Sequence, residues 1–324
     1  MLDPHGRRIN YLRLSVTGKC NLRCAYCRPQ GTEAAPRGPG SLSDADLLRV
    51  ARAAVSLGIE KIRVTGGEPL VRAGILPLLS RLARIPGLAK LVLTTNGIRL
   101  AGMAQGLREA GVDSVNVSLD SLRPDRFARI TGGGDLRKVL AGIDRAQECR
   151  FSSLKINTVV MRGINEDEIG EFAALTLNRP LRVRFIEFMP AASGGCARGL
   201  TVPGKEILSR LSKRFRLVPS EREPLSGPAR YFRIEGAAGA IGVITPVSCH
   251  FCAECNRIRV TADGRAKGCL FSGDDLDLTP FLRARDGAGL RRALRSVVSG
   301  KPERHPLSPD GSGVHPFPMA AVGG

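Results

Sequence analysis

Six short runs of aliphatic and β-branched residues alternate with helix-period segments along most of the chain. The runs are Tyr11 to Thr17, Lys61 to Thr65, Leu91 to Thr95, Ser114 to Leu119, Leu154 to Met161 and Val183 to Met189. Strands that alternate with helices pair in parallel through right-handed crossovers. The pattern therefore predicts an α/β fold, either a β/α barrel or an open sheet. Six units are too few for a complete eight-stranded barrel.

Capping signals predict helices between these runs. Residues 43–46 resemble a capping box in front of an apolar helical face, and Asp135 and Asn165 are predicted to open two further helices. Residues 199–206 approximate a phosphate-binding loop, but its lysine is not followed by Ser or Thr and no strand leads into it. We therefore predict that a helix starts there.

Three cysteines follow the first predicted strand with the spacing C-x3-C-x2-C, at Cys20, Cys24 and Cys27. A four-iron cluster normally takes four cysteines, so a loop that supplies three leaves one iron open for a small ligand. The alternative is zinc, but closed zinc sites need four ligands and favour a C-x2-C pair that is matched by a second pair. The spacing favours an iron-sulfur cluster.

A second group, Cys252, Cys255 and Cys269, has the spacing C-x2-C-x13-C. Three thiolates again suit a cluster with an open iron. Zinc is an equal alternative here, because Cys249 could complete a four-cysteine site. The neighbouring His250 is predicted to be a surface histidine.

In parallel β/α folds the functional residues gather at the carboxyl ends of the strands. Gly66 and Gly67 follow the second predicted strand, where the lack of side chains lets a ligand approach the backbone. Several cations project from the strands without matching acids, which indicates a polyanionic substrate such as a triphosphate. These cations are Arg13, Lys61, Arg63, Lys155 and Arg184.

The formal net charge is +19 and the isoelectric point about 10.4, which suggests anionic partners, a nucleotide, RNA or DNA. The basic residues are scattered, so a compositional bias explains the charge equally well. With no Trp and only 4% aromatic residues, stacking platforms for single-stranded nucleic acid are not evident. Nine cysteines, six of them in two groups, indicate metal binding in a reducing cytoplasm. No apolar run reaches membrane-spanning length, about 18 residues.

The composition changes after residue 215, where a Pro-, Gly- and Ser-rich connection leads into shorter predicted strands. We therefore expect a β/α domain over residues 1–215, a smaller module with the second cysteine group over 216–300, and a flexible tail over 301–324 that ends in Gly323 and Gly324.

The first cysteine motif, with Tyr26 before its last cysteine, resembles that of the radical S-adenosylmethionine (SAM) superfamily. The resemblance implies a 4Fe-4S cluster on Cys20, Cys24 and Cys27. Its open iron would chelate the amino and carboxyl groups of SAM, and its electron would split SAM to give a 5'-deoxyadenosyl radical. Gly66-Gly67-Glu68 resembles the GGE motif that holds the amino group of SAM in this superfamily.

The joint order of motifs is similar to the GTP 3',8-cyclase family of molybdenum cofactor biosynthesis. The motifs are Tyr11 to Thr17, Thr94 to Gly97, Asn116 to Asp120, Phe185 to Met189, Cys252 to Arg257 and the terminal Gly323-Gly324. The resemblance implies an incomplete (β/α)6 barrel and a C-terminal module with a second 4Fe-4S cluster, whose open iron meets the guanine of GTP. It implies that GTP becomes 3',8-cyclo-7,8-dihydroguanosine 5'-triphosphate.

The residue roles that the resemblance implies fall into four groups. Tyr26, Gly67, Ser118 and Met189 surround SAM. Arg13, Lys61, Arg63, Thr94, Lys155, Arg184, Arg257 and Arg259 contact GTP. Cys252, Cys255 and Cys269 bind the second cluster. Arg257, Arg259, Gly323 and Gly324 take part in catalysis.

The resemblance also implies a flavodoxin- or ferredoxin-type electron donor, cyclic pyranopterin monophosphate synthase as the downstream enzyme, and a homodimer. Two alternatives stay open: another radical SAM enzyme that acts on tRNA or a peptide, and a basic zinc-bearing protein that binds nucleic acid. The chain departs from the family at Gly18-Lys19, where Asp-Arg is usual, at Arg28, where Met is usual, and in the extra thiol of Cys249.

Overall fold

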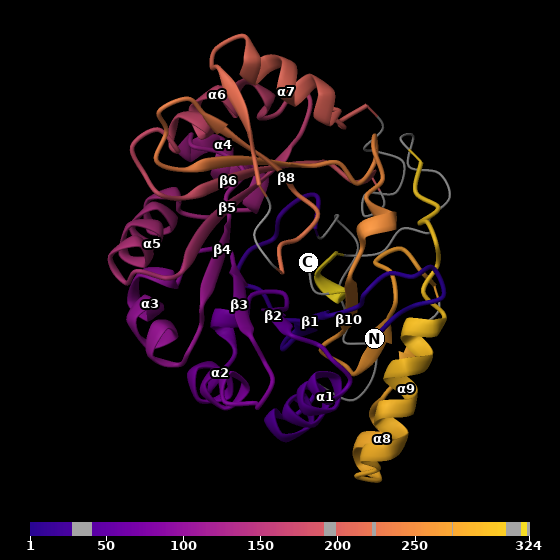
Figure 1. Cartoon of the computed structure of the whole chain (residues 1–324). Helices are drawn as coiled ribbons and strands as arrows, with labels where there is room; N and C mark the ends of the chain where they lie inside the picture. Colours follow the sequence, from indigo (N-terminus) through magenta and orange to yellow (C-terminus); the bar gives the residue numbers. More distant parts are fainter. Residues whose placement is uncertain (28–40, 191–198, 222–224, 274, 309–318, 323–324) are drawn as a thin grey trace.

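The protein is described by a computed structural model, which covers residues 1–27, 41–190, 199–221, 225–273, 275–308 and 319–322. The first six strands form the predicted parallel array, in sequential order. They are β1 Tyr11–Ser15, β2 Lys61–Thr65, β3 Lys90–Thr95, β4 Ser114–Ser118, β5 Ser153–Val160 and β6 Arg182–Glu187. They form a curved wall with helices on its outer side (Figure 1), so the prediction of a partial β/α barrel is confirmed.

The outer helices bury one apolar face each against this wall. They are α1 Asp44–Ser56, α2 Ile75–Ala83, α3 Leu100–Glu109, α4 Pro124–Thr131, α5 Leu136–Glu148, α6 Ile169–Ala174 and α7 Gly204–Ser212. Ser43 caps α1 by accepting from the Asp46 amide, and Asp135 caps α5, as predicted. The start of a helix after the false phosphate-binding loop is also confirmed, by α7.

A helical segment starts directly after Asn165, as predicted, but the Asn165 side chain makes no capping hydrogen bond. Its amide nitrogen donates to the carbonyls of Asp120 and Val159, and its Oδ1 accepts from the Met161 backbone. The following residues form a short 3-10 helix, η2 Glu166–Glu168, before α6. Tertiary hydrogen bonds to the end of β4 and to β5 thus take the polar atoms that a cap would have used.

The strands after residue 216 extend the same sheet at both of its edges. They are β7 Leu217–Ser220, β8 Arg230–Ile234, β9 Ala240–Ile244, β10 Arg257–Val260, β11 Arg265–Lys267 and β12 Leu276–Asp277. β9 pairs in parallel with β6, and β10 pairs in parallel with β1, which gives one sheet of twelve strands. The expected smaller module is therefore continuous with the barrel sheet and extends both of its edges.

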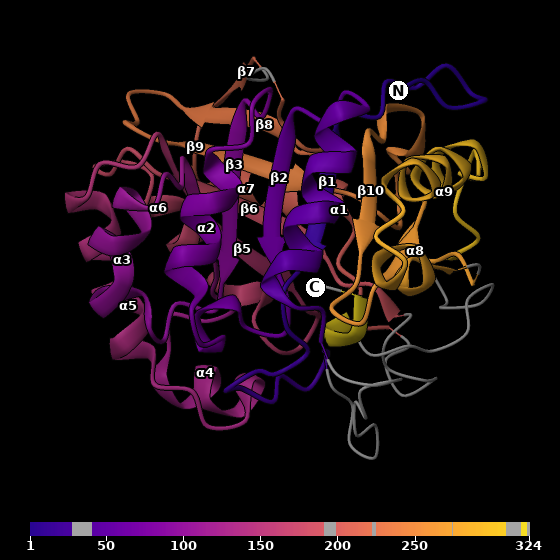
Figure 2. The ribbon, with the colours of Figure 1, turned by 90° about the horizontal axis from the view of Figure 1, so that it is seen from below.

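Helices α8 Thr279–Arg283 and α9 Gly287–Ser299 lie beside β10 (Figure 2). The segment after α9 was expected to be flexible from residue 301 onward, but residues 301–308 are packed. Lys301, His305 and Leu307 are all buried. The rest of the expected tail lies outside the described residues except the short 3-10 helix η5 Met319–Val322. No helix among the described residues is both long and apolar enough to span a bilayer.

Candidate active site

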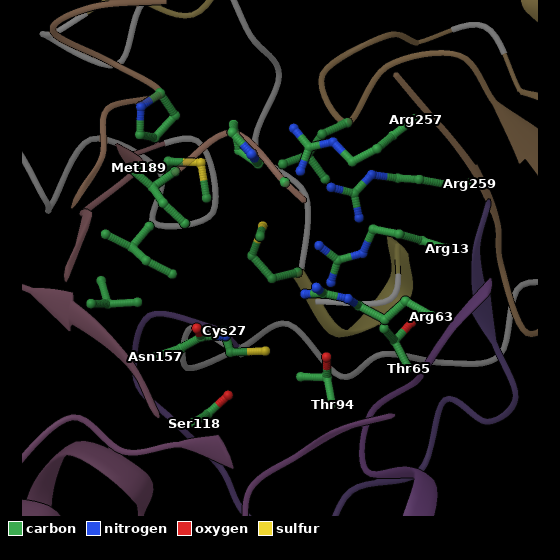
Figure 3. A pocket seen from close by; sticks show the side chains of 18 of the residues that line it. Arg13, Cys27, Arg63, Thr65, Thr94, Ser118, Asn157, Met189, Arg257 and Arg259 are labelled. Atoms are coloured by element: carbon green, nitrogen blue, oxygen red, sulfur yellow. The ribbon is translucent and has the colours of Figure 1, made fainter. Parts of the chain in front are cut away.

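The carboxyl ends of the barrel strands and the loops of the later strands enclose one cavity of about 300 Å³. Both cysteine groups reach it. The predicted site residues that line it are Arg13, Cys20, Cys24, Tyr26, Cys27, Arg63, Gly67, Thr94, Ser118, Arg184, Met189, Cys252, Cys255, Arg257, Arg259 and Cys269. Residues from distant parts of the sequence thus face a single space (Figure 3).

Two of the predicted GTP contacts, Lys61 and Lys155, do not line the cavity. Nζ of Lys61 lies 4.4 Å from the centroid of the Tyr11 ring and donates to the Leu225 carbonyl at 2.7 Å. Lys155 lies on the face of β5 that also carries Asn157, which does line the cavity. Both lysines therefore need a side-chain movement to meet a substrate there.

Gly66 and Gly67 let the end of β2 lie against the chain that leads into the first cysteine group. A Cβ on Gly66 would lie 2.6 Å from the Thr17 carbonyl oxygen, and one on Gly67 would lie 2.4 Å from that of Lys19. The Gly67 amide donates to Thr17 and the Glu68 amide to Lys19, at 2.7 and 2.8 Å. The two glycines therefore position the cluster loop as well as lining the cavity.

Glu68 joins the ends of β2 and β3. Its carboxylate accepts from the Thr95 hydroxyl and the Asn96 amide, both at 2.7 Å, and from the Leu70 amide at 3.0 Å. Burial raises the pKa of Glu68 to about 7, although these three donors favour the charged form. The fixed β3 end lets Asn96 Nδ2 approach Cys20 Sγ at 3.8 Å.

Asp120, just beyond β4, holds Tyr26 in place. The Tyr26 hydroxyl donates to Asp120 Oδ2 at 2.7 Å, and the Val159 amide donates to the other oxygen at 2.8 Å. Burial raises the pKa of Asp120 to about 6. This carboxylate also raises the pKa of Cys24, so it acts electrostatically on the first cysteine group.

The first cysteine group fits a metal cluster by its donor chemistry. Burial raises the pKa of Cys24 well above its ordinary value, and Asp120, Cys27 and Cys20 add to the shift. Three neighbouring thiols that repel one another as thiolates are stabilised when iron draws off their charge. The three residues therefore fit a four-iron cluster with one open iron.

The second cysteine group sits among cations. Lys301 Nζ lies 3.4 Å from Cys255 Sγ, and the Arg257 side chain also bonds to Cys255. Burial alone would raise the pKa of Cys255, but Arg257 and Lys301 outweigh it and lower the pKa to about 6. A thiolate is thus available near neutral pH, which suits a soft metal or cluster.

His250 is half-buried, so its prediction as a surface residue is wrong. Its ring stacks on that of His305 with centroids 4.0 Å apart. Ligand atoms of His250, His305 and Cys252 lie within 4.8 Å of one another, which is a donor set that zinc also accepts. Cys249, the expected fourth zinc ligand, is exposed and does not line the cavity.

Four arginines, Arg13, Arg63, Arg257 and Arg259, form one wall of the cavity, opposite Ser118 and Cys27 (Figure 3). Burial lowers the pKa of Arg63 and of Arg259 to about 10, and Arg257 adds to both shifts. Of the buried side-chain atoms that the structure describes, Arg63 Nε and Arg259 Nη1 lack a hydrogen-bond partner. Desolvated cations with unused donors favour an anionic ligand.

The C-terminal segment also reaches this space. Met319, the first residue of η5, lines the cavity, and Val322 is buried. Gly323 and Gly324, predicted to take part in catalysis, lie outside the described residues.

Two family models match consecutive parts of the chain. The radical SAM superfamily matches residues 14–176, and the family described as Molybdenum Cofactor Synthesis C matches residues 181–307. The first match runs from the end of β1 to α6 and includes the first cysteine group, and the second covers β6 with the later strands and loops that carry the other group.

A curated relative from Geobacter sulfurreducens, GTP 3',8-cyclase, is 56% identical over 325 residues, which is 100% of this chain and 99% of that protein. The chain belongs to the GTP 3',8-cyclase family. A second member, from Pelotomaculum thermopropionicum, is 47% identical over 94% of this chain and 95% of its own length. The chain is therefore a radical SAM enzyme of the first step of molybdenum cofactor biosynthesis.

Solved structures support the fold. SuiB from Streptococcus suis bound to S-adenosylmethionine matches with a TM-score of 0.61 and 15% identity, over 89% of this chain and 68% of that chain. The tagged anSMEcpe with bound AdoMet matches with a TM-score of 0.59 and 15% identity, over 91% and 78%. At this identity the similarity concerns the fold alone. Family membership decides against the tRNA, peptide and zinc-protein alternatives.

Three functional residues were not assigned a role from the sequence. Glu187 is buried and accepts from the amides of Gly204, Val247 and Ser248, so it ties the end of β6 to the loop before the second cysteine group. Asp120 holds Tyr26 beside the first triad. Lys301 contacts Cys255 of the second triad. Asp120 had a signal, since it follows a strand end by two residues, whereas nothing near Lys301 in the sequence indicated its contact with Cys255.

Proposed function

We propose that this chain converts GTP to 3',8-cyclo-7,8-dihydroguanosine 5'-triphosphate in a single cavity that holds two 4Fe-4S clusters, SAM and GTP. The observation that carries the proposal is that both cysteine triads and four arginines line one space. A reaction between the ribose and the base of one nucleotide needs that nucleotide to be held at both ends.

The first triad, Cys20, Cys24 and Cys27, would hold the cluster that binds SAM. When bound, this cluster supplies the electron that cleaves SAM to methionine and a 5'-deoxyadenosyl radical. Around it, Gly67 offers backbone to the amino group of SAM, and Tyr26, Ser118 and Met189 would complete the site. Asp120 fixes Tyr26 through its hydroxyl, so the ring keeps one orientation beside the cysteines.

The second triad, Cys252, Cys255 and Cys269, would hold the cluster that meets the guanine. Arg13, Arg63, Arg184, Arg257 and Arg259 would bind and orient GTP, together with Thr94. Lys61 and Lys155, which share strand faces with the cavity residues Arg63 and Asn157, would turn toward the triphosphate. Arg257 and Arg259 lie beside the second triad and would also stabilise charge on the base during cyclisation.

The atoms balance as an isomerisation. The hydrogen at ribose C3' passes to the 5'-deoxyadenosyl group, and the C3' radical forms a bond to C8 of the guanine. One electron and one proton then complete the 7,8-dihydro ring, so the product has the mass of GTP. The protein must keep C3' and C8 together and exclude water and oxygen, which a buried cavity with charged walls can do.

Anaerobic purification with iron, sulfide and zinc analysis tests this proposal, followed by incubation of the reduced protein with SAM and GTP. We expect about eight irons per chain, because each cluster carries four, GTP-dependent 5'-deoxyadenosine and an isomer of GTP by mass spectrometry. About four irons with one zinc, and SAM cleavage that is indifferent to GTP, would refute the two-cluster proposal. In that case His250, Cys252 and His305 would be the zinc ligands to test first.

Gly323 and Gly324 are proposed to act in cyclisation, because the segment before them lines the cavity at Met319. Deletion of both glycines should abolish the cyclised product while iron content and SAM cleavage are retained. A truncated protein with full cyclase activity would exclude this role.

The remaining partners are proposed on family grounds. We infer a flavodoxin- or ferredoxin-type electron donor, cyclic pyranopterin monophosphate synthase as consumer of the product, a homodimer and a reducing cytoplasmic location, where the free thiols of the cysteine groups persist.

A further inference from the structure

Lys301 lies at the end of α9 and reaches back to the second cysteine triad. Its Nζ contacts three acceptors: the Gly268 carbonyl at 2.6 Å, the Arg257 carbonyl at 3.0 Å and Cys255 Sγ at 3.4 Å. An ammonium group has three N–H donors, so all three are used. The whole residue is only 4% exposed, and the charge is therefore held at a fixed place beside the thiol.

The backbone around Lys301 is built for this contact. The Lys301 amide donates to the Val298 carbonyl at the end of α9. A Cβ on Gly268 would lie 3.2 Å from Lys301 Cα and 3.0 Å from the Val297 carbonyl oxygen, so a glycine here favours the close approach. Gly268 immediately precedes Cys269, and Arg257 follows Cys255 by two residues. Lys301 thus joins both parts of the second triad.

Charged side chains lie near both triads. At the first triad, the carboxylate of Asp120 adds to the rise in the pKa of Cys24, and Cys20 accepts from Leu22 N and Asn96 Nδ2. Near the second triad, Arg257 and Lys301 are cations in contact with Cys255. Glu254, the acidic residue of that loop, is exposed.

We propose that Lys301 raises the reduction potential of the second cluster through its charge and its N–H···S bond to Cys255. The inference rests on the proposed two-cluster function. Reduction adds a negative charge to a cluster, so a fixed cation and a hydrogen bond to a ligand sulfur favour the reduced form.

The test is a redox titration of the full-length chain, monitored by electron paramagnetic resonance. All variants carry C20A, C24A and C27A, so that the second cluster alone gives the signal. At the midpoint potential of the parent, we expect K301M to lower the ratio of reduced to oxidised cluster at least tenfold, which is a negative shift of 59 mV for a one-electron couple. K301R, which keeps the charge, should restore most of the ratio, and K301Q should fall between the two.

The matched control is K267M. Lys267 is also buried in this module, but its Nζ pairs with the carboxylate of Asp275 at 2.9 Å. K267M should leave the ratio unchanged. A K301M protein with four irons and an unchanged potential would overturn the inference and leave the proposed function intact. Zinc in place of iron at the second triad would overturn both.

Discussion

Replacing Lys61 by glutamine tests whether this buried lysine takes up a proton when a triphosphate binds. Burial, Arg63, Arg184 and Lys90 together lower the pKa of Lys61 from 10.5 to about 6. In the free protein at pH 8, the amine is then about 1% protonated, and charging it costs roughly 3 kcal/mol, at about 1.36 kcal/mol per pH unit. A bound triphosphate would restore the charge, so GTP binding should take up a proton.

The sign follows from the number of bound protons. Because the complex holds one proton more than the free components, the affinity for GTP should fall as the pH rises above 6, by up to about 100-fold at pH 8. The terminal phosphate of GTP loses its last proton near pH 6, which acts in the opposite direction but equally in both proteins. The ratio of the K61Q dissociation constant to that of the parent should therefore be largest at pH 6 and shrink toward pH 8.

Titration calorimetry of GTP into the anaerobic, SAM-loaded protein measures this directly, in buffers that differ in ionisation enthalpy. We expect uptake of nearly one proton at pH 8 for the parent and nearly none for K61Q. The same substitution should also remove the contribution of Lys61 to the pH dependence of the free energy of unfolding. The unfolded chain binds more protons at Lys61 between pH 6 and 10.5, so the free energy of unfolding of the parent rises with pH across this window. Equal proton uptake by both proteins would refute the argument.

Two further substitutions test the positions of the strand ends. G67A should displace the first cysteine loop, since its Cβ would lie 2.4 Å from the Lys19 carbonyl oxygen. We expect the variant to lose about four irons per chain. The control G102A, whose Cβ would have no atom within 4 Å, should keep them. E68Q should flatten the pH dependence of stability. The pKa of Glu68 is about 7 in the folded protein and 4.5 ordinarily. Between these two pH values the folded parent protein therefore binds more protons at Glu68 than the unfolded chain does. Its free energy of unfolding falls by roughly 3 kcal/mol from pH 4.5 to pH 7 as a result. Urea unfolding at pH 5 and pH 8 measures this, and an unchanged slope in E68Q would contradict the assignment.

The strands and the cysteine groups could be predicted because each depends on residues that are close together in the sequence. The six strand runs match β1 to β6 to within two residues, and the caps at Ser43 and Asp135 are made by side chains close to their partners along the chain. The helix start at Asn165 was also predicted, but its side-chain hydrogen bonds were not. Its hydrogen bonds go to the end of β4 and to β5, which no local pattern reveals.

The order of the strands in the sheet could not be predicted for the later part of the chain. The composition change at residue 216 suggested a separate module, but β9 and β10 pair with opposite edges of the barrel sheet. This pairing joins residues more than fifty positions apart, so a local change in composition does not reveal it. Lys301 is the same case on a smaller scale, since its thiol partner lies 46 residues earlier.

This strand order places the two cysteine groups at the two ends of one cavity. The first group follows the carboxyl end of β1, whereas Cys252 and Cys255 precede β10. Because β10 pairs with β1 in parallel, the second group lies toward the amino end of the same strands. Arg13 of β1 lies opposite Arg259 of β10 and Arg63 of β2 in this register. A row of guanidinium groups therefore crosses three neighbouring strands, and the carboxylates of Glu68 and Asp120 lie near the first triad. Under the proposed function, this separation of charge would attract the anionic nucleotide to the arginine side of the cavity and repel it from the acids, which would orient GTP.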